Sequence, residues 1–273
     1  MKKNKASKKL FTYIISLILL LLAFLVSLEI GSSGVSFLNF ILSGGEDVEK
    51  NIIHIRLSQT LAVLISGISL SISGFVLQRI TRNNLVDPGI TGVLSGSALG
   101  ITLLSFISIN VVGLISVFRI VFSIVFGILV SSLLIITSII YKDSLKVILF
   151  GVMINSFISG VIVLIQSLLD PYKLHQTFSF LIGSVSIPSE EFIILGILIL
   201  IFSIIAILSF SNKLDVISLG EIDAQVLGVD IRIWRTIFFV IAALISGIAV
   251  SFTGIIGFVG FIIPNLVNII SYR

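Results

Sequence analysis

The sequence has no cysteine, and its 273 positions include only two histidines and 11% charged residues. Without cysteine the chain has no disulfide framework, no thiolate metal site and no cysteine nucleophile. His54 and His175 lie far apart, so no histidine-based metal site is expected. The sequence also lacks a P-loop, a Gly-x-Ser-x-Gly motif and a pair of carboxylates within an apolar run. Nothing therefore points to an enzyme or to a bound cofactor.

The shortage of charge indicates a membrane protein. A soluble domain carries about 25% charged residues, whereas this chain combines 11% with 57% hydrophobic residues and a mean hydropathy of +1.26. We expect an all-α fold, a polytopic bundle of membrane helices in one domain over residues 1–273. The net charge of +4 is no sign of nucleic-acid binding, because the basic residues sit in short loops between apolar runs. A transporter, a channel and a membrane scaffold remain as functional classes.

Apolar runs of about 20 residues, the length that a ~30 Å hydrocarbon core requires, recur along the chain. The first exceeds the apolar part of a signal peptide and has no clear cleavage site, which favours a retained span. The eight expected spans are 10–28, 57–78, 89–108, 113–139, 145–168, 190–210, 232–252 and a shorter, glycine-broken one through 254–270.

The basic residues predict the orientation. With the N-terminus in the cytoplasm, the inside segments hold 13 of the 17 lysines and arginines and the outside segments hold three. This is the bias expected of a multi-pass protein of the plasma membrane. Arg119 falls within a span, two turns from its outer end, which favours snorkelling to the interface over an intramembrane function.

The longest polar interruption in the second half of the chain, 211–235, is predicted to lie inside. Apolar residues recur in it at helical spacing between Gly220 and Gly228, which indicates a short amphipathic helix on the membrane surface. The alternative is an ordinary solvated loop. The apolar residues are Leu219, Ile222, Val226 and Leu227.

An internal repeat relates Leu64–Gly74 to Leu244–Gly254, with seven of eleven positions identical at an offset of 180. With both copies taken as inward-going, the repeat is parallel, about an axis along the membrane normal. The first repeat covers about 56–168 and the second, incomplete by this symmetry, about 232–273.

A row of glycines and a stripe of polar residues indicate how the helices pack and where an aqueous path through the membrane could run. Gly92, Gly96 and Gly100 form a face on which another helix can approach. The span 145–168 carries a polar stripe within about 80° of arc, which either lines an aqueous path, the interpretation we favour, or bonds to a neighbouring helix. The stripe consists of Gly151, Asn155, Ser159 and Gln166.

The half-apolar outer segment 170–191 is predicted to place a short helix, Gln176–Ile182, at the outer mouth.

Four ordered motifs resemble those of iron-chelate and vitamin B12 ABC-transporter permeases. They are Gly74–Gly92 (GFVLQRITRNNLVDPGITG), Phe180–Ser186, Ser218–Val229 and Gly254–Asn265, and the resemblance covers about residues 10–273. The motif residues carried over are Gly74, Gln78, Arg82, Asn83, Asp87, Pro88, Gly257, Gly260 and Pro264.

The resemblance implies an importer subunit with ten spans that works as a homodimer or heterodimer. Two cytoplasmic ATPase subunits dock on such a permease, and an extracytoplasmic binding protein delivers an iron–siderophore, haem or corrinoid. The span 145–168 would then line the path, and Gln176–Gly183 would be an outer gating helix. Coupling to the ATPase would fall to Ser218, Leu219, Gly220, Glu221, Ala224, Leu227 and Gly228.

The chain also departs from the family pattern. Arg56 matches an outer arginine that meets the binding protein, but Gln59 does not supply the second charge. Asn84 and Ile255 replace prolines, and Asn265 stands where histidine is common. The last two of the ten spans are missing, so we expect a partial chain or a non-transporting homologue as the alternative. An ion-coupled secondary transporter is less favoured, because no span holds a carboxylate at mid-membrane.

Overall fold

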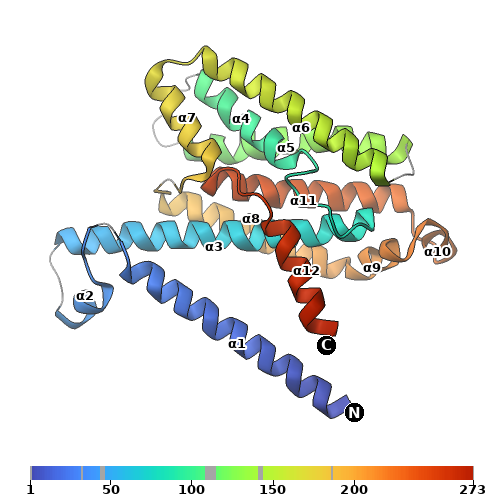
Figure 1. Cartoon of the computed structure of the whole chain (residues 1–273), viewed down its shortest axis with the longest axis horizontal. Helices are drawn as coiled ribbons and strands as arrows, with labels where there is room; N and C mark the ends of the chain where they lie inside the picture. The colour runs from blue at the N-terminus through green and yellow to red at the C-terminus, as the bar shows by residue number, and fades with distance from the viewer. Residues whose placement is uncertain are drawn as a thin grey trace.

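The computed structural model describes residues 2–31, 33–43, 47–107, 115–140, 144–185 and 187–272, and its regular elements in these ranges are all α-helices. The predicted all-α bundle is therefore confirmed (Figure 1). The helices are α1 (Lys2–Glu29), α2 (Phe37–Ser43), α3 (Asp47–Thr81), α4 (Val93–Ile107), α5 (Ile115–Ile140), α6 (Ser144–Ser167), α7 (Pro171–Gly183), α8 (Glu190–Ser209), α9 (Ser211–Leu219), α10 (Glu221–Val226), α11 (Ile231–Thr253) and α12 (Val259–Tyr272).

The helices coincide with the expected spans. Among the described residues, five stretches are long and apolar enough to cross a membrane: Asp47–Thr81, Val117–Thr137, Leu149–Ser167, Glu190–Ser209 and Ile231–Thr253. Shorter apolar helices, Tyr13–Glu29, Val93–Ile107 and Val259–Ile270, occupy the other three predicted positions. Helices suit these runs because backbone groups in lipid find no water and must bond within their own segment.

The centre of the fold is the pair α3 and α11, which hold the two copies of the repeat. Ser66 Oγ donates to Ala249 O at 3.2 Å, and Ser73 Oγ donates to Ala242 O at 3.0 Å. Residue numbers rise along α3 as they fall along α11, so the two helices are antiparallel. The prediction of a parallel repeat is therefore wrong. Four further spans, in α4, α5, α6 and α8, lie between the copies, and α11 must cross in the opposite direction to α3.

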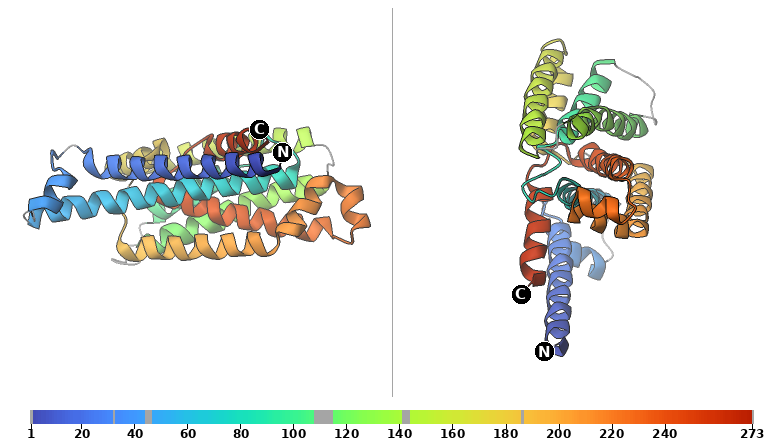
Figure 2. Two further views of the ribbon diagram at one scale, coloured as in Figure 1. Left: turned by 90° about the horizontal axis from the view of Figure 1, so that it is seen from below. Right: turned by 90° about the vertical axis from the view of Figure 1, so that its right-hand side faces the viewer.

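A second layer, α4 to α6, packs beside this pair (Figure 2). A Cβ atom on Gly96 would lie 2.7 Å from Phe126 O, and one on Gly100 would lie 2.3 Å from Phe122 O. Only a residue without a side chain permits these backbones to approach so closely. The predicted small-residue face on this helix is confirmed, and its partner is α5.

The short surface helices gather at two opposite ends of the bundle (Figure 1). Helices α9 and α10 lie where α3 ends and α11 begins, and we call this the α10 end. Helices α2 and α7 lie at the other end, where α3 begins. Helix α1 contacts α3 close to its own C-terminus, where Ser27 and Thr60 hydroxyls are 2.9 Å apart, and then extends away from the bundle.

Candidate functional site

The polar segment between α8 and α11 folds as two short helices joined at Gly220. Helix α9 ends at Leu219 and α10 runs over Glu221–Val226. Gly220 has φ 139° and Gly228 has φ 71°, both in a region that side-chain-bearing residues rarely adopt. The predicted helix between the two glycines is confirmed. Ser218 belongs to α9, where its Oγ donates to Asp215 O at 2.7 Å.

The apolar side chains of this segment face away from the bundle. Ile222 is 79% exposed and Val226 is 81% exposed, whereas the small side chain of Ala224 is fully buried. A helix packed on its own protein normally buries its larger apolar residues, and a contiguous exposed cluster marks an interaction surface. We call the cluster of Leu219, Ile222, Val226 and Leu227 the α10 apolar surface.

One arginine pairs with the start of α10, and a second lies beside it. Glu221 Oε1 lies 3.6 Å from Arg235 Nη2 on α11. A Cβ atom on Gly220 would lie 3.2 Å from Arg82 Nη1, so the glycine gives the arginine room beside the backbone. A cavity of about 470 Å³ opens beside this contact, and its lining includes Glu221, Gln225 and Arg235. From the sequence, Arg235 is only one of the basic residues of the cytoplasmic segment 211–235, and nothing there indicates Glu221 as its partner.

The first and last family motifs meet in one junction. A Cβ atom on Gly74 would lie 2.0 Å from Gly260 O, and one on Gly260 would lie 2.7 Å from the Pro88 ring. Gln78 Nε2 donates to Val86 O and to Gly260 O, both at 3.3 Å. These glycines are required by steric contact, and Gln78 bonds backbone carbonyls on both motifs. The two blocks are therefore one packing unit of α3, its following turn and α12.

Asp87 is the buried carboxylate of this junction. It is 5% exposed, and its Oδ1 accepts from Gly89 N at 2.5 Å. Burial raises the pKa of the Asp87 carboxyl above its usual 3.8, and backbone N–H groups of Gly89, Phe261 and Ile90 act in the opposite direction. The side chain closes the turn between α3 and α4 and ties it to α12.

Other motif residues complete or border the junction. Asn83 Oδ1 accepts from Leu85 N at 2.9 Å, and Pro264 is buried inside α12. Asn265 Nδ2 donates to Asn84 O at 3.0 Å, so two positions that depart from the family pattern contact each other. A Cβ atom on Gly257 would meet nothing within 4 Å, and no steric reason for that glycine is visible.

The polar stripe of α6 divides between packing and exposure. A Cβ atom on Gly151 would lie 2.6 Å from Ile90 O. Asn155 Nδ2 donates to Gly89 O and, at 3.3 Å, to Ile90 O. Ser95 Oγ donates to Asn155 Oδ1 at 2.5 Å. At these two stripe positions the structure shows the alternative interpretation, a bond to a neighbouring element.

The other two residues of the stripe, Ser159 and Gln166, have different surroundings. Ser159 is exposed, and Gln166 is 8% exposed with no partner for its Nε2 within the described residues. Lining of a translocation path by these residues stays a prediction.

Arg56 is anchored inside the chain. Its side chain is buried against the α1–α2 connection, and a Cβ atom on Gly31 would overlap its guanidinium at 2.4 Å. Docking of a binding protein on Arg56 stays a prediction, and it would require the guanidinium to leave these acceptors. The guanidinium donates to Leu28 O (2.8 Å), Glu29 O (3.2 Å), Val35 O (2.8 Å) and Ser33 Oγ (2.8 Å).

The short outer helix is longer than predicted. Helix α7 begins at Pro171, where Asp170 caps it by accepting from Lys173 N at 3.0 Å. An Asp-Pro pair is a helix-start signal that the sequence interpretation did not use. Arg119 lies 5.3 Å from the Phe180 ring on α7, a cation–π contact at the end of its span. Within the described residues, no three His, Asp or Glu side chains lie together as a metal site.

The sequence is similar to those of several known permease proteins. The hemin transport system permease protein HmuU of Yersinia pestis is 27% identical over 259 residues, covering 92% of this chain and 76% of the relative. The molybdate import system permease protein MolB of Haemophilus influenzae is 33% identical over 221 residues, covering 80% of this chain and 64% of the relative. The vitamin B12 import system permease protein BtuC of Serratia proteamaculans is 27% identical over 230 residues, covering 82% and 67%.

The fold of the chain is similar to that of a solved transporter structure. It is described as an inward-facing conformation of a metal-chelate type ABC transporter, and it matches with a TM-score of 0.77 at 30% identity, covering 98% of this chain and 82% of that one. The family model of the FecCD transport family matches residues 19–272. The chain is thus a multi-pass membrane protein that belongs to the FecCD transport family, a family of permease subunits rather than enzymes.

Proposed function

We propose that the chain is the membrane-spanning permease subunit of an ATP-driven importer, carrying an iron-siderophore-type chelate delivered by an extracytoplasmic binding protein. Relatives named for hemin and for iron chelatin transport support an iron chelate as substrate. The molybdate and vitamin B12 relatives support the wider class of metal-containing substrates. ATP hydrolysis belongs to separate cytoplasmic subunits in this proposal.

The α10 apolar surface carries the proposal. Ile222, Val226 and the neighbouring leucines are exposed at the end of the bundle that holds Arg79 of α3 and the arginines of α11. Basic residues concentrate on the cytoplasmic side of membrane proteins, so this end faces the cytoplasm and the N-terminus lies there too. An apolar cluster on a short, glycine-bounded helix suits a groove on an ATPase subunit.

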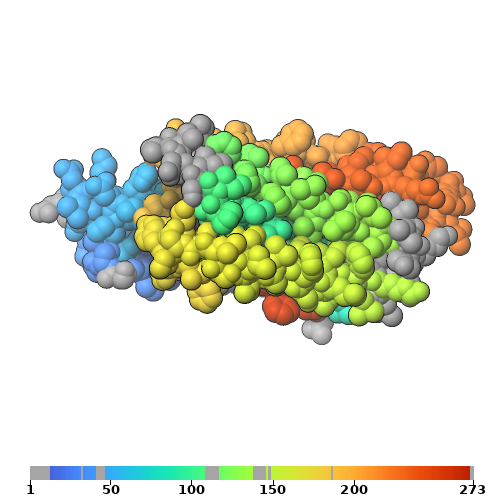
Figure 3. Space-filling model, turned by 90° about the horizontal axis from the view of Figure 1, so that it is seen from above, coloured from blue at the N-terminus to red at the C-terminus, as the bar shows by residue number. Residues whose placement is uncertain are grey.

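Helix α6 is proposed to line the path beside a second permease subunit. It runs along one face of the molecule (Figure 3), and Met153, Phe157 and Leu164 on it are more than 60% exposed. The face is open along most of the helix, as a contact with a second copy or a related subunit requires. Nucleotide-driven movement of the ATPases would move α10, and the α6 pair would open or close the path. A ligand drives such a change only through different affinities for the two states.

ATP-dependent uptake of a labelled iron chelate by the reconstituted importer tests this function. Gly220→Pro is expected to insert normally and to abolish import, because proline cannot adopt φ 139°. Ile222→Asp, on an exposed side chain, is expected to abolish import and to release the ATPase. Asp215→Ala, at an exposed position on α9, is the matched control and is expected to import normally.

The outcomes separate the alternatives. Normal uptake in Gly220→Pro would sink the coupling assignment. Uptake that needs no ATPase subunit would indicate a secondary transporter. Assembly without any uptake by the unmutated chain would indicate a non-transporting scaffold.

A further inference from the structure

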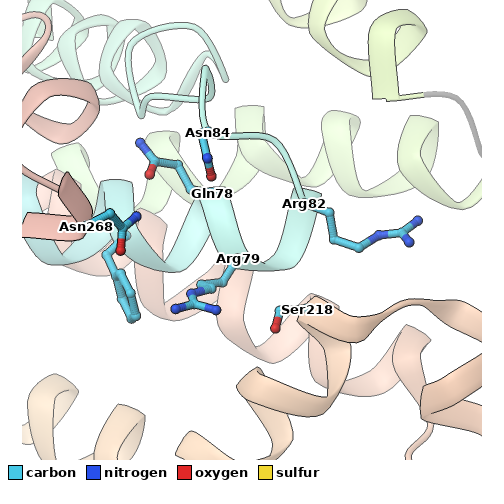
Figure 4. Close-up of a pocket in the computed structure, with 7 residues that line it drawn as sticks. Gln78, Arg79, Arg82, Asn84, Ser218 and Asn268 are labelled. Carbon is cyan, nitrogen blue, oxygen red and sulfur yellow. The ribbon is translucent and has the colours of Figure 1, made fainter. Parts of the chain in front are cut away.

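A polar cavity of about 360 Å³ lies at the α10 end, between α3, α9 and α12 (Figure 4). It is separate from the cavity beside Glu221. Figure 4 shows the Arg79 side chain lying between Asn268 and Ser218, while the Arg82 side chain extends away from Arg79 at the rim. The lining residues are Phe75, Gln78, Arg79, Arg82, Asn84, Ser218 and Asn268.

The cavity is at the depth of lipid headgroups. Arg56 and Arg79 bound the stretch 57–78 of α3, and none of the 22 residues in it is charged. At 1.5 Å per residue this stretch is about 33 Å long, close to the ~30 Å of a hydrocarbon core. The two arginines therefore mark the two edges of the apolar layer, with Arg79 at the edge of the α10 end.

The lining is cationic and rich in donors. Within the described residues, no carboxylate lines the cavity and neither Arg79 nor Arg82 forms an ion pair. The Arg79 guanidinium carbon lies over the Phe75 ring, 5.3 Å from its centroid, in a cation–π contact. A guanidinium can form paired bonds with phosphate oxygens.

Apolar surface lies on the same helix as one of these donors. Asn268 reaches the cavity from α12, and Val267 and Ile269, one position before and after it, are 53% and 59% exposed farther round the helix. Because the cavity lies at the edge of the apolar layer, a lipid can place its headgroup there while its acyl chain lies along the apolar part of the bundle.

We propose that this cavity binds the phosphate of an anionic glycerophospholipid, with Arg79 as its main ligand, Asn268 as a further donor, and Arg82 adding positive potential at the rim. Basic pockets between membrane helices on the cytoplasmic side are suited to such headgroups. The site lies where α3, α9 and α12 meet. A bound lipid would therefore fix the base of the segment that carries the α10 apolar surface.

The test measures binding of phosphatidylglycerol to the purified full chain by native mass spectrometry, with phosphatidylcholine as the neutral comparison. Arg79→Gln is expected to weaken phosphatidylglycerol binding about fivefold, the factor that matches ~1 kcal/mol for one basic residue near an anionic surface. Arg79→Lys keeps the charge and is expected to retain most of the binding. Lys213→Gln, which removes one positive charge on α9 outside the cavity, is the matched control and is expected to bind as the unmutated chain does.

Each other outcome overturns the proposal. Equal binding by Arg79→Gln and Lys213→Gln would show that the cavity is not the lipid site. Binding of inorganic phosphate alone, with the same dependence on Arg79, would assign the site to a free anion. Loss of ATPase assembly in lipid-free detergent by Arg79→Gln, with lipid binding unchanged, would assign Arg79 to a protein partner. Asn268→Leu removes a donor without changing charge, and unchanged binding in that folded variant would exclude the assigned headgroup position.

Discussion

Glu221 on α10 and Arg235 on α11 form an ion pair at 3.6 Å, which joins the helix of the α10 apolar surface to a helix that crosses the bundle. The two side chains are 34% and 15% exposed, so water screens the pair only in part. Arg82 approaches the same point from α3. Movement of α10 would therefore act on both central helices rather than on a loose loop.

Breaking this pair is expected to loosen α10. Glu221→Ala and Arg235→Ala should each raise the rate of proteolysis within 220–228 up to about fivefold, because a partly exposed pair contributes ~1 kcal/mol or less. The double variant Glu221→Arg with Arg235→Glu should recover most of the protection. The check is limited proteolysis of the purified chain, followed by mass spectrometry. Equal rates in all variants would show that the pair does not hold α10.

The glycine contact at the motif junction can be tested on one helix. Gly74→Ala is expected to lower the free energy of unfolding by about 1–3 kcal/mol, the usual cost of overpacking, because its Cβ would overlap Gly260 O. Gly67→Ala on the same helix is the control, since a Cβ there meets nothing within 4 Å. Thermal unfolding in detergent compares the two. A loss in Gly67→Ala as large as in Gly74→Ala would refute the steric explanation.

Two of the four members of the α6 stripe, Asn155 and Ser159, are expected to respond differently to substitution. Asn155→Leu removes donors from the carbonyls of Gly89 and Ile90, and leaving such groups unpaired costs about 1–3 kcal/mol. Ser159→Ala, at an exposed position, should leave stability unchanged. Chemical unfolding of both variants measures the difference. A stable Asn155→Leu variant would favour a role for Asn155 in the path alone.

The sequence predicted elements well where a single segment decides the structure. Each apolar run became a helix because lipid leaves the backbone no other partner, and Gly220 and Gly228 marked the ends of α10 because few other residues adopt their φ values. The direction of the repeat was wrong because similar residues alone do not report which way a helix crosses. The alternating spans between the copies did hold that information.

The site was harder to predict because its contacts are long-range. The family motifs identified Gly74 and Gly260, but nothing in the sequence showed that they touch. Arg56 has the pattern of an exposed docking charge, yet its guanidinium is buried by carbonyls of the α1–α2 connection, which carry no side-chain signal. The Glu221–Arg235 ion pair could not be predicted either, because nothing in the sequence shows that these two side chains touch.

The buried carboxylate of the junction predicts a pH effect. Because burial raises the pKa of Asp87 above 3.8, the folded chain binds this proton more tightly than the unfolded chain does. The contribution of Asp87 to the free energy of unfolding therefore grows as the pH falls through the folded-state pKa, and it is lost as the pH rises through it.

Asp87→Asn keeps an oxygen for Gly89 N and removes the titration. The variant should be at least as stable as the unmutated chain at neutral pH, and the difference should shrink as the pH falls. Thermal unfolding from about pH 8 to about pH 4 measures this, with Asp215→Asn as the exposed control. A difference that widens toward acid pH would show that the hydrogen bonds to Asp87 outweigh its burial.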